Sequence, residues 1–182
     1  DAFDPLLRVQ ENLDYSAAVR CPHLSSEERR KRVDAKLVEL GLNEMRLRLA
    51  GTPRQKYLSG GERKRLNAGL DMIGIADVYL FDEPTSGLSS KDSEHVLELI
   101  RSLAHNKIVF ASIHQPSMKL LRMFDKALLL DKGGKMAFFG TPQAMLEYFW
   151  EAYREETGQR DEPPQLPGQI TPDFVFDVLE TR

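Results

Sequence analysis

Two acidic residues, Asp82 and Glu83, follow an apolar run in the middle of the chain. The run, at residues 77–83 (DVYLFDE), is continuous rather than alternating, which is typical of a strand buried on both faces of a sheet. Carboxylates at the C-terminal edge of a parallel sheet lie where α/β proteins bind ligands. The first carboxylate suits Mg²⁺, usually through water, and the second can orient or deprotonate a water molecule. Acids in this place also cap ordinary turns.

His114 ends the next apolar run, at residues 107–114 (KIVFASIH). If the two strands are in register, the imidazole and the two acids share one edge of the sheet. A single histidine in such a place more often has a structural role. Paired with Asp82 and Glu83, it becomes a candidate for contacting a terminal phosphate.

A third candidate is the triplet Ser59, Gly60 and Gly61, which precedes a basic, helix-compatible stretch at residues 62–72. Without side chains, the glycines let backbone amides approach an anion closely. A helix N-terminus adds free N–H donors and the positive end of the helix dipole. Ser59 falls at about the N-cap position. The triplet is therefore suited to contact a phosphate.

Helix caps and hydrophobic spacing predict the elements that position these residues. Residues 1–52 have a helical pattern, in which Ser25 and Glu28 form an S-x-x-E capping box and Gly41 is a stop signal. A further short helix is expected at residues 43–50. The other expected elements are strands at 77–83, 107–114 and 126–131, a hairpin strand at 136–140, and helices at 61–72, 91–104, 118–124 and from 141 onward.

Strands that alternate with helices indicate an α/β fold with a mostly parallel sheet flanked by helices. We expect residues 1–72 to form an N-terminal helical subdomain that ends in the glycine-rich triplet and its helix. Residues 73–154 then form the α/β core. Residues 155–170, which contain Pro163, Pro164 and Pro167, are typical of a linker, and residues 171–182 of a short helix.

Composition narrows the class of protein. The chain has 182 residues, of which 41% are apolar and 29% charged, as in a soluble globular domain. Its net charge of −3 gives no general drive toward nucleic acid, and no apolar run approaches the roughly 20 residues of a membrane span. Cys21 is the only cysteine, so no internal disulfide can form. Because the sequence begins at Asp1 without methionine, we expect a segment of a longer chain.

Four motifs in order resemble those of an ABC transporter ATPase. LSGGE, VYLFDE, SGLS and SIHQP are similar to the signature motif, Walker B with its catalytic glutamate, the D-loop and the switch histidine. SGGERKR, IHQP and TPDFVFDVLE resemble the G subfamily in particular, and residues 1–20 are similar to its segment after the Q-loop. The resemblance implies the P-loop NTPase fold of the ABC type, with ATP and Mg²⁺ as cofactors.

The resemblance also implies roles for the candidate residues. Two nucleotide-binding domains of this family close head to tail around two ATP molecules. Asp82 would serve Mg²⁺ through water, Glu83 would be the general base, and His114 would hold the γ-phosphate of the nucleotide on their own domain. The residues expected to act in trans on the partner's nucleotide are Ser59, Gly60, Gly61, Glu62 and Ser89.

The implied partners are a second nucleotide-binding domain, identical or not, and a transmembrane domain after Arg182. The implied location is the cytoplasmic face of a membrane, the implied process is export, and no nucleic acid is involved. We expect the segment itself to be soluble.

The sequence departs from the family pattern in three ways. It contains no G-x-x-x-x-G-K followed by Ser or Thr, and the Q-loop glutamine is absent, so we expect a truncated domain that neither binds ATP well nor hydrolyses it alone. Ser89 stands where the D-loop aspartate is expected. Two other functions remain open: a soluble ABC-type ATPase that acts in DNA repair or translation, and a non-catalytic regulatory partner domain.

Overall fold

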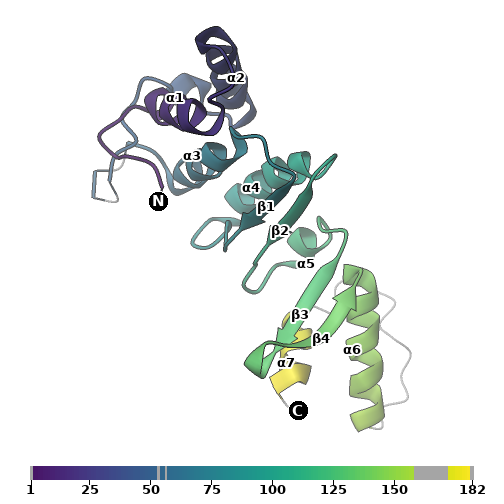
Figure 1. The fold of residues 1–182 in the computed structure, drawn as a ribbon. Coiled ribbons are helices and arrows are strands. Elements are labelled where there is room, and N and C mark those ends of the chain that lie inside the picture. Colours follow the sequence, from purple (N-terminus) through teal and green to yellow (C-terminus); the bar gives the residue numbers. More distant parts are fainter. Residues whose placement is uncertain (1, 53, 56, 158–171, 181–182) are drawn as a thin grey trace. The chain divides into compact units, whose positions relative to one another are not determined.

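The computed structural model describes residues 2–52, 54–55, 57–157 and 172–180. The chain divides into two units, Asp1–Ile113 and His114–Arg182, and each unit is described by itself. The first contains a group of helices and a pair of parallel strands, and the second contains a hairpin and three helices (Figure 1).

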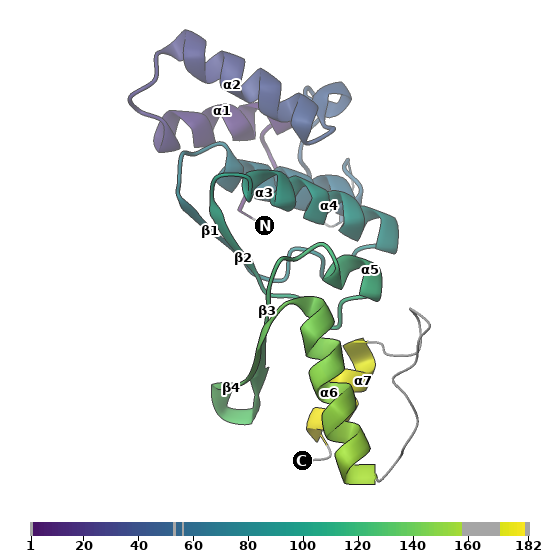
Figure 2. The same ribbon diagram turned by 90° about the vertical axis from the view of Figure 1, so that its right-hand side faces the viewer.

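The helical part of the first unit consists of α1 (Val9–Arg20), α2 (Ser26–Glu39) and α3 (Gly60–Met72). Figure 2 shows α1 and α2 side by side. The capping box at the start of α2 is confirmed: the Ser25 amide donates to Glu28 Oε2 at 2.8 Å, and the Glu28 amide donates to Ser25 Oγ at 3.3 Å. Such reciprocal bonds satisfy N–H groups that a helix leaves unpaired at its first turn.

The prediction of a short helix at residues 43–50 was wrong, because only a 3-10 turn at Asn43–Met45 forms. Beyond the turn, the backbone of residues 46–50 pairs with residues 7–10, which lie just before α1 and in its first turn. The Val9 amide donates to the Arg48 carbonyl at 2.9 Å, and the Ala50 amide donates to the Leu7 carbonyl at 2.9 Å. These bonds with a distant segment replace the hydrogen bonds that a helix would have made.

The core of the first unit lies between the three helices and the loops that join them. Its buried members recur at helical spacing on facing sides of α1, α2 and α3, as expected for amphipathic helices. They are Phe3, Val9, Leu13, Ala17, Val33, Leu37, Leu40, Leu42, Ala50, Leu58, Leu66, Leu70 and Ile73.

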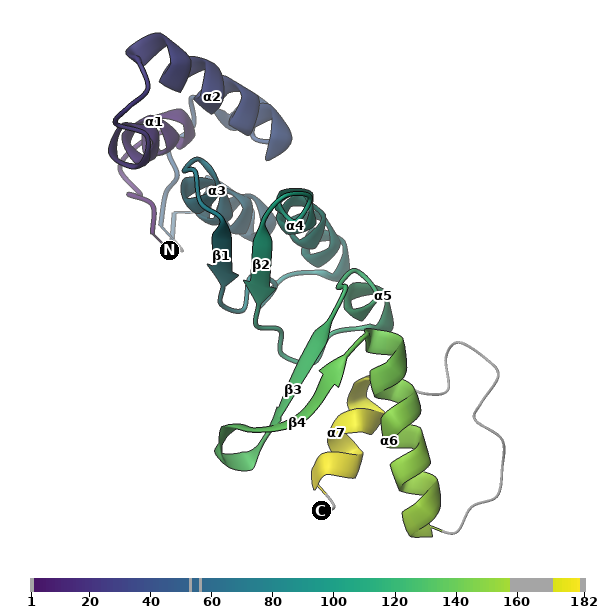
Figure 3. The same cartoon turned by 45° about the vertical axis from the view of Figure 1, so that its right-hand side comes forward.

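Strands β1 (Val78–Phe81) and β2 (Ile108–Ala111) are parallel, and α4 (Ser90–Leu103) connects them (Figure 3). Both strands are shorter than the predicted runs. Tyr79 is buried, but Leu80 is 76% exposed and Phe110 is 57% exposed. The prediction that these strands are buried on both faces was therefore wrong for the described residues. α4 packs against β2, and the alternate residues Val78, Leu80, Ile108 and Phe110 of the two strands are exposed.

The second unit contains α5 (Met118–Leu121), β3 (Ala127–Asp131), β4 (Lys135–Gly140), α6 (Pro142–Thr157) and α7 (Pro172–Glu180). The predicted hairpin is confirmed, since β3 and β4 are antiparallel and the turn between them contains Gly133 and Gly134, both with positive φ. Only glycine adopts this backbone conformation without a steric penalty.

Helix α6 runs to Thr157, so the first three residues assigned to the linker at 155–170 are helical instead. The rest of that linker and the N-cap expected at Thr171 lie outside the described residues. Helix α7 covers most of the short helix predicted at 171–182. The core of this unit consists of Leu121, Met145, Leu146, Phe149, Val175 and Val178.

Candidate nucleotide-binding site

Asp82 and Glu83 follow directly after β1, and both are exposed. The parallel ladder continues one residue past β2, where the Ser112 amide donates to the Phe81 carbonyl at 2.9 Å. The ladder therefore places the first residue after β2 beside the acids after β1. The Ser112 hydroxyl donates to Asp82 Oδ1 at 2.6 Å, and the Glu83 amide donates to Ser112 Oγ at 2.9 Å.

Sequence reasoning missed Ser112 as part of this site. Asp82 and Glu83 stood out because they are two acids at the end of an apolar run. A single serine shortly before His114 carries no such signal. The signal was the register of the two strands, which pairs Phe81 with Ala111 and so brings the following residues together.

The backbone of Glu83 has a φ of 42°, a left-handed conformation that costs a residue with a side chain on the order of 1–3 kcal/mol. Hydrogen bonds hold the backbone of Glu83 on both sides. Its amide is bound by Ser112, and its carbonyl accepts from the Ser86 amide at 3.1 Å and from Lys64 Nζ at 3.4 Å. The carboxylate projects from a backbone that its neighbours hold in place.

The glycine-rich triplet lies at the start of α3, as predicted. Ser59 is the N-cap, and its hydroxyl accepts from the Glu62 amide at 3.2 Å. In return, Glu62 Oε2 accepts from the Ser59 amide at 2.7 Å. Ser59 still has its own O–H to donate, and Gly60 is exposed at the first helical position. In the structure, Glu62 acts on the cap, and the groups available to an anion come from Ser59 and Gly60.

Ser89, in the D-loop segment, is the N-cap of α4. Its hydroxyl donates to Asp92 Oδ2 at 2.8 Å and accepts from the Asp92 amide at 3.2 Å. Asp92 Oδ1 also lies 3.7 Å from Nη1 of Arg65 on α3. The serine that replaces the expected aspartate thus holds another aspartate, three residues further along, against the helix of the signature-like motif.

His114 is the first residue of the second unit, and its side chain is exposed. It lies three residues beyond the end of β2 in the chain. Its grouping with Asp82 and Glu83 stays a prediction.

The acids were expected to serve Mg²⁺, and the donor set can be compared with the needs of that ion. Among the described residues, no three His, Cys, Asp or Glu side chains form a cluster that could hold a metal alone. Mg²⁺ is usually held by one or two carboxylates, with waters and substrate phosphates completing its shell. The exposed Asp82 carboxylate, oriented through one oxygen by Ser112, fits a site shared with a nucleotide.

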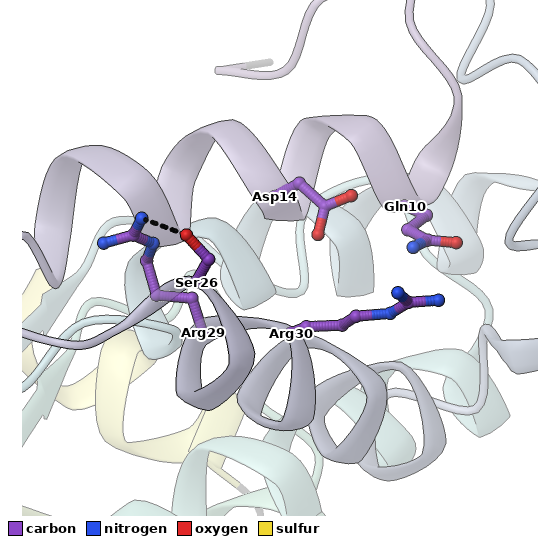
Figure 4. A pocket seen from close by; sticks show the side chains of 5 residues that line it. All are labelled: Gln10, Asp14, Ser26, Arg29 and Arg30. Atoms are coloured by element: carbon purple, nitrogen blue, oxygen red, sulfur yellow. Dashed lines mark hydrogen bonds between the residues drawn. The ribbon is translucent and has the colours of Figure 1, made fainter.

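A pocket of about 330 Å³ lies between α1 and α2 (Figure 4). Its lining is polar and consists of Gln10, Asp14, Ser26, Arg29 and Arg30. Burial raises the pKa of the Asp14 carboxyl, and a hydrogen bond with Gln10 opposes this effect. None of the motif residues lines this pocket, so it is separate from the candidate nucleotide site.

Comparison with known proteins agrees with the motifs. A family model described as ABC transporter matches residues 1–86, and one described as ABC-2 type transporter matches residues 114–181. The chain belongs to the ABC transporter family. The predicted resemblance and the fold class that it implies are confirmed.

Relatives place this family member near the G subfamily. The chain is 37% identical over 175 residues to the broad substrate specificity ATP-binding cassette transporter ABCG2 of Rattus norvegicus, which covers 95% of this chain and 25% of the relative. It is 38% identical over 176 residues to ABC transporter G family member 28 of Arabidopsis thaliana, covering 96% and 15%. It is 40% identical over 152 residues to Protein white of Drosophila melanogaster, covering 82% and 22%.

The chain thus spans about a quarter or less of the length of these relatives. Within the described residues, no helix combines the length and the apolar character that crossing a bilayer requires.

Proposed function

We propose that this family member is part of an ATP-hydrolysing domain that powers transport across a membrane, in the direction of export. The observation that carries the proposal is the pair Asp82 and Glu83 at the end of a parallel strand, with Glu83 held in a strained backbone conformation. Strain of this kind persists where the surroundings hold it and is concentrated at functional sites.

Each acid has a distinct role in this proposal. Glu83 accepts a proton from the water that attacks the γ-phosphate, or orients that water, because its carboxylate is exposed and its backbone is held. Asp82 would hold Mg²⁺ through water with its oriented carboxylate. When bound, Mg²⁺ neutralises charge on the phosphates. His114 contacts the γ-phosphate.

The start of α3 acts on a second nucleotide, bound by a partner domain. Ser59 donates its hydroxyl, and the exposed amide of Gly60 supplies the positive end of the helix. The capping box supports this role, because it holds the first turn of α3 in place before a ligand arrives. Ser89 contributes indirectly by holding Asp92 against this helix.

The segment of 182 residues alone is inactive in this proposal, because the sequence lacks the glycine-rich lysine loop that cradles β- and γ-phosphates. Activity requires the full-length transporter, with a second nucleotide-binding domain, identical or different, and a transmembrane domain. The domain then lies at the cytoplasmic face of the membrane.

The test is Glu83→Gln in the full-length transporter that contains this chain. We expect Mg-ATP binding to be retained and turnover to fall by a factor on the order of 10² or more, because the amide cannot accept the proton. Glu44→Gln, which removes an exposed acid from the 3-10 turn, is the control and should hydrolyse ATP normally. An unchanged rate in Glu83→Gln removes Glu83 from the base role. Failure of the unaltered transporter to bind Mg-ATP favours a regulatory domain instead.

A further inference from the structure

We propose that Ser112 is a positioning residue for ATP hydrolysis, which sets the place of both Asp82 and Glu83 through its single hydroxyl. The inference rests on the proposed function and adds a role for the first residue of the SIHQP motif, to which the resemblance assigned none. Ser112 belongs to the same unit as both acids and follows β2 directly.

The Ser112 hydroxyl acts both as a hydrogen-bond donor and as an acceptor. A serine hydroxyl has one proton to donate and two lone pairs to accept with. The proton goes to Asp82 Oδ1 at 2.6 Å, and one lone pair accepts the Glu83 amide at 2.9 Å. The bond to Asp82 is charge-assisted and short, which makes it stronger than a neutral bond. One oxygen atom therefore fixes the carboxylate of one acid and the backbone of the next.

The bond to the Glu83 amide opposes a local tendency of the chain. With φ at 42°, the residue would relax toward the right-handed or extended region if nothing held it. Such a rotation about the backbone redirects the Cα–Cβ bond, and the carboxylate at the end of the side chain moves further still. A group that must reach one water molecule loses much of its effect after a displacement of about 1 Å.

The contacts of the hydroxyl point to positioning more than to packing. The Ser112 side chain is exposed, so its loss leaves no cavity and removes little buried apolar surface. The ladder bond that Ser112 makes through its amide to the Phe81 carbonyl does not involve the side chain. Removing the hydroxyl should therefore disturb the acids and leave the strand pair intact.

The test compares Ser112→Thr with Ser112→Val in the full-length transporter. These side chains have nearly the same shape and differ in the hydroxyl. We expect Ser112→Val to lower kcat by about tenfold or more with the KM for ATP changed less than about twofold, and Ser112→Thr to restore most of kcat. Ser102→Ala is the control: it removes a hydroxyl that bonds the Leu99 carbonyl on α4, and it should leave both constants unchanged.

A second readout does not depend on turnover. Hydrogen exchange of the Glu83 amide should accelerate by about tenfold in Ser112→Val and stay slow in Ser112→Thr, because only the latter keeps the acceptor oxygen. The two proposals fail in different ways. If Glu83→Gln abolishes turnover while Ser112→Val hydrolyses ATP normally, the positioning role is overturned and the function stands. If Glu83→Gln has no effect while exchange at Glu83 still responds to Ser112→Val, the hydroxyl contact is real but the catalytic assignment fails.

Discussion

A side-chain carbon on Gly61 would lie 2.3 Å from Oδ1 of Asp92, which is closer than any real contact between such atoms. Gly61 is at the start of α3, and Asp92 is in the first turn of α4. The second glycine of the triplet is thus needed for close packing between two helices, whatever its role toward a phosphate. Gly60 differs, since a side-chain carbon there would meet the nearest atom, Leu88 Cδ2, at an ordinary 3.7 Å.

Gly61→Ala should destabilise the first unit by about 1–3 kcal/mol, because the new methyl group must displace the Asp92 carboxylate from Ser89. Gly60→Ala is the matched control and should be neutral or slightly stabilising. Urea unfolding of the two variants measures the difference. Adding Asp92→Ala to Gly61→Ala should recover part of the loss, and equal stability of the two single variants would contradict the packing argument.

Asp14→Asn should stabilise the first unit at neutral pH. Burial raises the pKa of the Asp14 carboxyl above its ordinary value of 3.8, and repulsion from Asp34 adds to this, while Gln10, Arg46 and Arg30 act in the opposite direction. Because its pKa is raised, the protonated Asp14 carboxyl stabilises the folded state. This stabilisation is complete below pH 3.8 and is lost as the pH rises through the folded-state pKa of Asp14. Asparagine stays neutral and avoids that loss, which solvent screening limits to less than about 1 kcal/mol.

Thermal unfolding between pH 3 and pH 7 measures this effect: the advantage of Asp14→Asn should shrink toward about pH 3, where Asp14 is protonated as well. Glu28→Gln is the comparison of opposite sign. Hydrogen bonds from Ser25 lower the pKa of Glu28 below 4.5. The ionised Glu28 carboxylate therefore stabilises the folded state above pH 4.5, and this stabilisation is lost as the pH falls through its folded-state pKa. Glu28→Gln should therefore destabilise at neutral pH. A constant difference between Asp14→Asn and the unaltered chain at every pH would contradict the assignment to Asp14.

Leu37→Ala should lower the free energy of unfolding of the first unit by about 2–5 kcal/mol, because it empties part of the core between the helices. Val38→Ala, at the next position, removes a side chain that is 67% exposed and should change stability by less than about 0.5 kcal/mol. Chemical denaturation of both variants gives the comparison. Similar losses from the two would mean that α2 presents a different face to the core.

Leu80→Thr combined with Phe110→Thr should reduce self-association of the 182-residue chain. The two residues are direct partners across β1 and β2, and both lie on the exposed apolar face. Apolar patches of this kind favour association, and threonine keeps the strand propensity. Light scattering as a function of concentration measures the effect. Val19→Thr, which replaces an equally exposed apolar residue on α1, is the control, and an equal response from it would mean that this face of the strands is not responsible.

Local sequence by itself determined where α2 and α3 begin and which residues were candidates for the chemistry. The caps at Ser25 and Ser59 were predictable because the bonds that make them join residues three apart. The motif around Asp82 and Glu83 was likewise readable from adjacent residues. Even so, the resemblance was needed to distinguish these acids from an ordinary turn.

Tertiary structure decided everything that depends on residues distant in the chain. The helix predicted at residues 43–50 does not form, because the backbone there makes hydrogen bonds to a segment some forty residues earlier. Ser112 joined Asp82 through a strand register spanning 30 residues, and Gly61 met Asp92 where two helices pack. The exposure of one face of β1 and β2 also depended on tertiary structure, because a strand face is buried only where another element packs against it. Such contacts depend on how segments pair in space, and the spacing of residue types along the chain records that pairing only weakly.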